Sequence, residues 1–419
     1  MQRLFNSSCI KQFFTSVILF LAVCGLALYF PNKYVGHGFV VVAALLGLAQ
    51  LLIATRQHFI KWSWGIVWPA ALLVMLLSLL VGYFVHGGDK DWRRLNEFIE
   101  IAAIGFVLFL VFSQFSSEEV RVKKLMPWVL ALGAGITGLL LISTWSKYGF
   151  NGRMWQGTSM INISAGTQII LVGSLMGFLV ASKFHWSRLF WVVAIALGSV
   201  SIFASGSRGA WLALLTCFCL AGLFLFSKTG WKVIVTTSLV AVLSFYALLQ
   251  TNQVQQRIEH GKNDIAKYID GGQRKTSLGL RFEMWRSAWD GFVAHPFTGM
   301  GAAPLGQRWQ GIDHDYHLVP LSPHVHNDFL EAAQSRGLLG LTSVLLLLIA
   351  PVYLGWRYRE SQYGKALFVA TGGFIVACLF DSHLVMKFAL FYYVTMQSVL
   401  LGLLIGDVSK STPAVQTAE

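Results

Sequence analysis

Residues 338–355 read LLGLTSVLLLLIAPVYLG, an apolar run without a single charged side chain. An α-helix of about 18 residues rises about 27 Å, close to the roughly 30 Å thickness of the hydrocarbon core of a membrane. Runs of this kind recur along the chain, so the sequence predicts an all-α polytopic membrane protein with about twelve transmembrane helices. The predicted spans are 13–30, 38–54, 64–85, 99–115, 125–144, 165–182, 189–205, 209–226, 233–249, 338–355, 365–380 and 388–405.

The composition excludes a soluble protein with one membrane anchor. Of the 419 residues, 55% are hydrophobic and only 12% are charged, whereas about a quarter of the residues of an ordinary soluble domain are charged. The net charge of +13 does not indicate nucleic-acid binding, because the Lys and Arg residues form short clusters between the apolar runs. Such clusters are typical of a protein whose partners include anionic membrane lipids.

The distribution of Lys and Arg predicts the direction of the spans. With the N-terminus in the cytoplasm, the inner segments hold 15 Lys and Arg residues and the short outer loops hold 8. Cytoplasmic loops of membrane proteins carry the excess of these residues, so we expect both termini in the cytoplasm. The outer segment with Lys90, Arg93 and Arg94 is the main exception.

This orientation puts one long hydrophilic loop, residues 250–337, on the outer side between the ninth and tenth spans. The loop contains six of the eleven histidines, and its aromatic residues distinguish it from a disordered linker. We expect a small, mainly helical cap with helices over 281–293 and 326–336. The predicted domains are spans one to nine in 1–249, the loop domain in 250–337, spans ten to twelve in 338–405, and a cytoplasmic tail in 406–419.

The most informative polar stretch runs from Ser322 to Gly340 and contains His326. Pro323 and the polar residues after it indicate a helix start, and Gly337 indicates its end. We expect His326 in the first turn of this helix, where the positive end of the helix dipole disfavours the imidazolium form. A neutral imidazole is suited to act as a general base. The alternative is an interfacial histidine satisfied by hydrogen bonds.

A second polar stretch is the short outer turn from Ser205 to Trp211. We expect Arg208 at the N-terminus of the following span, with Ser205 or Ser207 as the cap. A guanidinium beside the unsatisfied N–H groups of a helix N-terminus is a favourable phosphate site. The alternative is an arginine that extends to lipid headgroups.

A third stretch, residues 277–289, combines Arg281 with Trp285 and Trp289. Arg281 and Trp285 share a helical face, because they are four residues apart. Arginine pairs with phosphate oxygens, and aromatic rings pack on the apolar faces of sugars, so this combination suits a ligand with both groups. The alternative is an amphipathic interfacial helix with its tryptophans in the headgroups.

Asp381 ends a predicted span on the same outer side. A carboxylate so close to the membrane is usually paired, and it would either orient His326 or hold one of the arginines. The alternative is a helix-end residue in water.

The sequence gives no reason to expect a metal or another cofactor. His314, His317, His324 and His326 lie near one another in the chain, but their spacing matches no standard metal motif. Nor does the chain contain a Walker-type loop, a Gly-rich dinucleotide turn or a Gly-x-Ser-x-Gly elbow, which argues against a nucleotide-driven enzyme or a serine hydrolase.

Three motifs give the chain a family resemblance. His326-Asn327, nine further residues and Gly337-x-x-Gly340 form a pattern that resembles the signature of the bacterial O-antigen ligases and their relatives. Those relatives are the O-antigen polymerases and the O-linked protein oligosaccharyltransferases. The turn Ser205-x-Ser-Arg-Gly209 and the stretch Gly279-x-Arg-x-x-x-Trp285 are also similar to that family, and the resemblance covers most of the chain.

The resemblance implies a glycosyltransferase with a periplasmic active site in the bacterial inner membrane. O-antigen ligases transfer O-antigen polysaccharide en bloc from undecaprenyl pyrophosphate to the lipid A-core oligosaccharide, without a nucleotide or metal cofactor. The resemblance implies His326 as catalytic base, Arg208 and Arg281 as pyrophosphate-binding residues, and Asp381 as a supporting acid. From the residues themselves we add His324 and Asn327 as supporting residues and Trp285 and Trp289 as contacts to the acceptor or sugar, and direct attack by the acceptor would invert the anomeric configuration.

Two kinds of alternative remain open at this point. A polymerase or a protein oligosaccharyltransferase uses the same lipid-linked donor, although protein-glycosylating members often carry an extra C-terminal region. A transporter or flippase for lipid-linked sugars belongs to another class. It needs charges within the spans, and the predicted spans are nearly free of charge apart from Glu100. A ligase could also work with a polymerase as its partner.

Overall fold

The computed structural model describes residues 8–29, 33–53, 65–114, 124–148, 154–155, 158–183, 185–205, 207–226, 250, 252–271, 274–309 and 323–411. Regular structure in these residues is helical, apart from the short antiparallel pair β1 (Met154–Trp155) and β2 (Thr158–Ser159), in which Met154 faces Ser159. The helices are α2 (Ser8–Leu28), α3 (Lys33–Ile53), α4 (Val67–His86), α5 (Asp89–Ser113), α6 (Met126–Tyr148), α7 (Met160–Ala181), the 3₁₀ turn η3 (Trp186–Arg188), α8 (Leu189–Ala204), α9 (Arg208–Phe226), α11 (Asn252–Gly271), α12 (Ser277–Ala294), α13 (Leu305–Arg308), α14 (Asp328–Arg357), α15 (Gln362–Phe380) and α16 (Lys387–Ser411).

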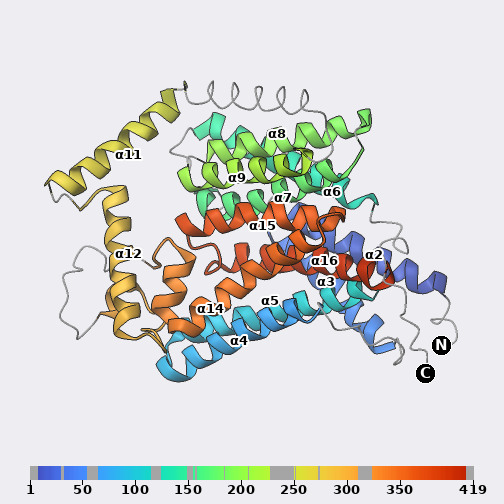
Figure 1. Ribbon diagram of the computed structural model, residues 1–419, viewed down its shortest axis with the longest axis horizontal. Helices are drawn as coiled ribbons and strands as arrows, with labels where there is room; N and C mark the ends of the chain where they lie inside the picture. The colour runs from blue at the N-terminus through green and yellow to red at the C-terminus, as the bar shows by residue number, and fades with distance from the viewer. Residues whose placement is uncertain are drawn as a thin grey trace.

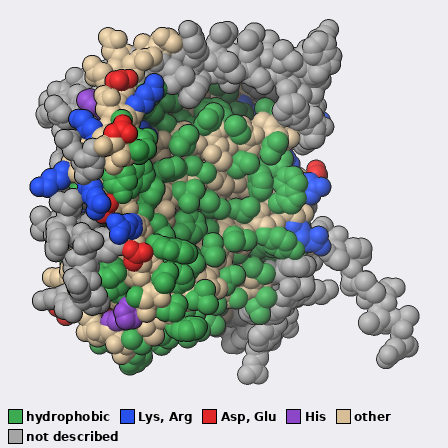
Figure 2. All heavy atoms as spheres, turned by 60° about the vertical axis from the view of Figure 1, so that its left-hand side comes forward, with side chains coloured by type: hydrophobic (Ala, Val, Ile, Leu, Met, Phe, Trp, Pro, Cys, Tyr) green, Lys and Arg blue, Asp and Glu red, His purple; other side chains and the backbone are tan. Residues whose placement is uncertain are grey.

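The chain is a polytopic membrane protein. Within the described residues, eight helical stretches are long and apolar enough to cross a membrane, and α2, α6 and α7 contain shorter apolar stretches. Each of these helices coincides with one predicted span. The predicted span 233–249 lies outside the described residues, so the total of twelve stays a prediction. Figure 2 shows one flank of the molecule as a broad hydrophobic surface with charged side chains gathered toward its edges, as a lipid-facing wall requires.

Helices α15 and α16 form the centre of the bundle. Nearly all of the α16 span and two thirds of the α15 span are buried, whereas only 28% of the α3 span is buried. Helix α7 packs against α15 through small residues: Gly177 meets the backbone of Ala366, and a Cβ on Gly173 would lie 2.7 Å from the Cα of Ala370. Such glycines let transmembrane helices approach backbone to backbone. The loop between α15 and α16 is therefore anchored by the two most buried helices.

Helix α12 crosses one end of the spans, and α11 extends beside it away from the bundle (Figure 1). Thr276 caps α12 by accepting a hydrogen bond from the Gly279 N–H at 3.0 Å. Tyr268 of α11 donates to Glu283 of α12 at 2.9 Å, which joins the two helices. Helix α2 begins and α16 ends at the opposite end of the bundle (Figure 1).

The helix predicted over 281–293 is part of α12, and the helix predicted over 326–336 is the first part of α14. Gly337 breaks α14 with φ 63° and ψ −152°, a conformation that is essentially restricted to glycine. The predicted helix end at Gly337 is therefore confirmed as a sharp break, beyond which the apolar part of α14 continues.

The segment that follows α12 satisfies the backbone groups freed by this break. Met300 N–H donates to the Gln334 carbonyl at 2.7 Å, Gly301 N–H donates to the Ser335 carbonyl at 3.0 Å, and Leu338 N–H donates to the Pro296 carbonyl at 2.7 Å. A buried backbone group without a partner is costly. These bonds therefore fix residues 296–301 against the break and connect α12 to α14.

Gly337→Ala is expected to lower the free energy of unfolding by roughly 1–3 kcal/mol or more, because alanine cannot adopt this backbone conformation without strain. The new Cβ would also lie 2.5 Å from the Phe297 carbonyl oxygen and 2.6 Å from the Pro296 carbonyl oxygen. Thermal unfolding of the purified protein in detergent measures the effect. Gly222→Ala in α9 is the control, since its Cβ meets nothing within 4 Å. Equal melting temperatures for the two variants would contradict the role of Gly337.

Candidate active site

The turn before α14 holds His326 in an unusual conformation. His326 is the only non-glycine residue with positive φ among the described residues, at 56°. Asn327 is the N-cap, and its Oδ1 accepts the N–H groups of Phe329 and Leu330, both at 3.0 Å. The expectation that His326 lies in the first helical turn is therefore wrong: the carboxamide of Asn327 starts the helix at Asp328. A strained residue of this kind suggests a functional constraint.

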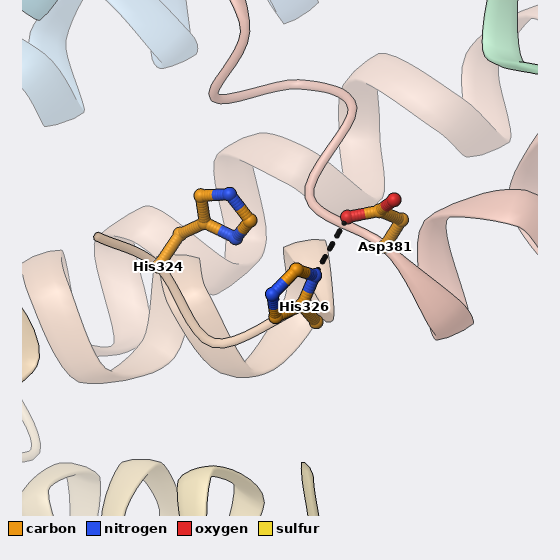
Figure 3. Close-up of side chains that lie close together, drawn as sticks. All are labelled: His324, His326 and Asp381. Carbon is orange, nitrogen blue, oxygen red and sulfur yellow. Dashed lines mark hydrogen bonds and ion pairs between the residues drawn. The ribbon is translucent and has the colours of Figure 1, made fainter. Parts of the chain in front are cut away.

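Asp381 is the partner of His326 (Figure 3). The Asp381 Oδ1 lies 3.0 Å from the His326 Nδ1 and also accepts the Ser382 N–H at 2.9 Å. The Asp381 side chain is 8% exposed and that of His326 is 27% exposed. Burial opposes ionisation of Asp381, but the hydrogen bond with His326 and the charge of His383 outweigh it and hold the pKa of Asp381 well below its usual range.

This pair defines the chemistry available to His326. An ionised carboxylate only accepts hydrogen bonds, so the Nδ1 of His326 carries the proton that Asp381 accepts. In the neutral ring, Nε2 then has a free lone pair that can take a proton from another molecule. The arrangement is that of a general base oriented by a buried acid.

His324 and Asn327 flank this pair. The rings of His324 and His326 lie 4.3 Å apart, edge to face. Burial and the neighbouring His326 lower the pKa of His324 to about 4, so His324 is uncharged near neutral pH. Asn327 also donates from Nδ2 to the Leu379 carbonyl at 3.0 Å, which ties the turn before α14 to the end of α15. Both residues thus contact the segments that hold His326 and Asp381.

Arg281 reaches the same place from α12. Its Nη1 donates to the Phe380 carbonyl at 3.0 Å, one residue before Asp381. Burial lowers the pKa of Arg281 from its usual value, Asp381 partly offsets this effect, and Arg208 adds to it. Arg281 therefore lies within electrostatic range of both Asp381 and Arg208.

Arg208 is the first residue of α9, as predicted. Ser207 accepts the Ala210 N–H through its hydroxyl at 3.4 Å and supplies the cap. The Arg208 guanidinium lies against Gly261 of α11. Among the described residues, no carboxylate lies within ion-pair distance of Arg208 or Arg281. The two arginines therefore leave positive charge at the site.

The two tryptophans have different environments. Trp285 packs against a small buried cluster that includes Met284, Ala288 and Val325, whereas Trp289 is 56% exposed. The packing accounts for the position of Trp285 without a bound ligand, whereas the ring of Trp289 is open to contact from outside the protein. A contact of either ring with a sugar stays a prediction.

A buried carboxylate, Glu331, bonds to the backbone of the turn that holds His326. Its Oε1 accepts from Arg308 at 2.6 Å and from Arg94 at 3.0 Å, and its Oε2 accepts the Val325 N–H at 3.0 Å. The side chains of Glu331 and Arg308 are 1% and 0% exposed. Arg308 further donates to Gln334 at 2.8 Å. This ion triad of Arg94, Arg308 and Glu331 fixes the residue next to His326.

Among the residues that the structure describes, one group of side chains has the geometry to hold a metal ion. Ligand atoms of His324, His326 and Asp381 all lie within 4.8 Å of one another. The direct bond between His326 and Asp381, however, already uses one atom of each residue. The other histidines considered for a metal, His314 and His317, lie outside the described residues.

Comparison with known proteins bears on this geometry. Residues 192–345 match the family model described as O-antigen ligase. The resemblance drawn from the three motifs is therefore confirmed.

Two relatives match most of the chain. An O-antigen ligase of Escherichia coli (strain K12) is 23% identical over 330 residues, which cover 76% of this chain and 77% of that protein. A protein of Haemophilus influenzae described as uncharacterized is 27% identical over 297 residues, which cover 66% of this chain and 68% of that protein. The O-antigen ligase family match includes Arg208, Arg281 and His326, while Asp381 lies beyond it.

The ion triad of Arg94, Arg308 and Glu331 was not among the predictions from the sequence. A signal was present, because Asn327, Glu331 and Gln334 recur at helical spacing and form a polar face just before an apolar run. Such a face on a helix at the membrane surface indicates buried polar partners. The partners Arg94 and Arg308 are distant in sequence, so only the fold identifies them.

Glu331→Gln is expected to lower the free energy of unfolding by about 3–5 kcal/mol, because the buried guanidinium of Arg308 and the half-buried guanidinium of Arg94 would lose their counter-charge. Glu97→Gln is the matched control: Glu97 pairs with Arg93, whose side chain is 77% exposed, and an exposed pair contributes about 1 kcal/mol or less. Thermal unfolding in detergent compares the two variants. Similar, small shifts for both would show that the triad does not stabilise the turn.

Proposed function

We propose that this protein is an O-antigen ligase that transfers O-antigen polysaccharide en bloc from undecaprenyl pyrophosphate to lipid A-core oligosaccharide. The observation that carries this proposal is the His326–Asp381 pair at 3.0 Å beside Arg281, in a chain whose residues 192–345 match the O-antigen ligase family. The Escherichia coli relative with that name supports the same activity.

His326 is the base in this proposal. Its Nε2 takes the proton from a hydroxyl of the lipid A-core, while Asp381 keeps the ring oriented and stabilises the imidazolium that forms. The acceptor oxygen attacks the anomeric carbon of the first O-antigen sugar, and the bond from that carbon to the pyrophosphate oxygen breaks. A single displacement of this kind inverts the anomeric configuration. Trp289, exposed on α12, is a candidate contact to acceptor or donor sugars, with Trp285 beside it.

Arg208 and Arg281 bind the leaving pyrophosphate. Negative charge develops on the pyrophosphate as the bond to the sugar breaks, and guanidiniums fixed near it lower the energy of that state. The absence of a carboxylate partner for either arginine among the described residues supports this role, because their charge remains for a ligand. In this proposal the two guanidiniums, rather than a metal, neutralise the leaving group.

The proposed location is the bacterial inner membrane, with the active site on the periplasmic face and both termini in the cytoplasm. The site lies where α12 crosses the spans, and α2 begins and α16 ends at the other end of the bundle (Figure 1). The excess of Lys and Arg in the predicted inner segments supports the same direction. Both the lipid-linked donor and the lipid A-core acceptor are anchored in this membrane.

His326→Ala is expected to lower transfer by a factor of about 10² to 10⁴, the usual contribution of a general base. Asp381→Asn is expected to cost about 10²-fold, because a carboxamide no longer fixes the tautomer with Nε2 free. Purified protein, lipid-linked O-antigen and lipid A-core are assayed with EDTA present, where wild-type turnover is expected. His295→Ala is the control, since His295 is an exposed histidine just after α12.

Product analysis in a strain lacking the protein separates the alternatives. Core without O-antigen, together with long polymer on the carrier, supports the ligase. Core with a single repeat would indicate a polymerase, lost protein glycosylation would indicate a protein oligosaccharyltransferase, and carrier-linked sugar held on the inner face would indicate a flippase. Full transfer by His326→Ala, or wild-type loss of turnover in EDTA, would contradict the mechanism.

Arg208→Lys and Arg281→Lys are each expected to lower transfer about 10- to 100-fold. Lysine keeps the charge but loses the planar pair of donors that matches phosphate oxygens. Arg286→Lys is the control on α12, because its side chain is 50% exposed and faces Asp290. The same transfer assay measures all three. Wild-type turnover of Arg208→Lys would mean that Arg208 serves only as a membrane-surface residue.

A further inference from the structure

Two lysines lie at the membrane boundary on the same side as the His326–Asp381 pair. Lys33 is the first residue of the membrane-spanning stretch in α3, and Lys387 is the first residue of the stretch in α16. Helix α16 begins only six residues after Asp381. The ends of spans lie at the level of the lipid headgroups, so both lysines are at headgroup depth near the candidate site.

These lysines belong to one cluster, the Lys33 cluster, which consists of Lys33, His37, Glu100 and Lys387. The Lys387 Nζ lies 2.8 Å from Glu100 Oε2, and the His37 Nε2 lies 3.0 Å from Glu100 Oε1. The Lys33 Nζ lies over the ring of Phe388, 4.6 Å from its centroid. Three helices, α3, α5 and α16, thus bring Lys387 and His37 onto one carboxylate and Lys33 onto the ring next to Lys387.

The cluster is on the outside of the bundle. The side chains of His37, Glu100 and Lys387 are 30%, 37% and 34% exposed, and Tyr34 next to Lys33 is 76% exposed. On the side of a membrane-spanning bundle, this exposed surface faces lipid. A charged group in that position is costly unless it has a partner of opposite charge.

The charges within the cluster do not balance. Glu100 uses one oxygen for Lys387 and the other for His37. No carboxylate among the described residues lies within ion-pair distance of Lys33, and its ammonium is held over the Phe388 and Tyr34 rings instead. The cluster therefore carries net positive charge at headgroup depth.

A lysine that only extends to water needs none of this convergence. Here the ammonium of Lys33 is held in place by aromatic rings, a second lysine is fixed by an ion pair, and the exposed Tyr34 supplies apolar surface beside them. Ammonium groups bind phosphate as point charges, and basic groups at a membrane surface attract anionic headgroups. Phosphate attached to a lipid satisfies both the charge and the apolar surface.

We propose that the Lys33 cluster binds the phosphate group of an anionic lipid at the membrane surface beside the candidate active site. The phosphate can belong to an anionic phospholipid of the bilayer or to a phosphorylated glycolipid such as lipid A. Binding of the lipid does not depend on transferase activity, so either this proposal or the proposed function can be wrong without affecting the other.

Native mass spectrometry of the purified full-length protein in detergent tests the proposal. Phosphatidylglycerol and bisphosphorylated lipid A are titrated separately, each against phosphatidylcholine as the competitor without net charge. The wild-type protein is expected to prefer the anionic lipids. Lys33→Ala is expected to weaken their binding about tenfold, the size of one lost charge-assisted contact, Lys33→Glu is expected to weaken it further, and Lys33→Arg is expected to retain it.

Lys183→Ala is the matched control, because it removes one exposed lysine just after α7, away from the cluster. Thermal unfolding of each variant confirms that it is folded. Weaker binding of phosphatidylglycerol to the Lys33 variants assigns the site to a bilayer phospholipid, and weaker binding of lipid A alone assigns it to a glycolipid. Wild-type affinity of Lys33→Ala and Lys33→Glu for both lipids, or an equal loss in Lys183→Ala, overturns the proposal.

Discussion

The buried carboxylate of Glu331 is the constraint on which the candidate site depends. A charge without exposure to water must be neutralised within the protein, and here two arginines from distant segments do so: Arg94 from α5 and Arg308 from α13. An ion group of this kind adds little to stability compared with a well-packed apolar core, but the loss of one member is costly. Its structural effect is positional. It holds the start of α14, the described part of the loop domain and α5 in one arrangement, and its remaining oxygen fixes the Val325 N–H directly beside His326.

The strained backbone of His326 is tolerated because both sides of the turn are fixed. Val325 is held by Glu331, and Asn327 caps α14 while it also donates to the end of α15. Between these anchors His326 adopts φ 56°, and its ring meets Asp381, which α15 and α16 position from the centre of the bundle. The break at Gly337 completes the arrangement. It separates the short polar first part of α14, which carries the site, from the apolar part that crosses the membrane.

Much of this architecture is predictable from the sequence, because long apolar runs leave few structural options in a membrane. The site residues His326, Arg208 and Arg281 were found from local motifs, and their proximity to one another is visible only in the fold. The segment with Lys90, Arg93 and Arg94 runs against the predicted direction of the spans. The fold adds what the tally of charges could not contain, namely that Arg94 is paired with Glu331 and Arg93 with Glu97. The start of α14 was misplaced by two residues because a cap is decided by one side-chain hydrogen bond, which sequence periodicity does not reveal.

Charge balance distinguishes the candidate site from the ion triad of Arg94, Arg308 and Glu331 beneath it. In the triad, the buried Glu331 is paired with both arginines. Gln334 and the Ala303 carbonyl accept further hydrogen bonds from Arg308. At the site itself Asp381 is bonded to His326, and among the described residues no ion pair joins it to an arginine. Arg281 is bonded to a neutral carbonyl and is brought close to Arg208, an arrangement that repulsion between like charges disfavours. A fold that keeps two guanidiniums near each other without a carboxylate in direct ion-pair contact gains free energy when an anion binds between them. This gain favours a doubly charged ligand group such as pyrophosphate over a neutral sugar, and it gives the proposed donor a physical reason to bind at this end of the bundle.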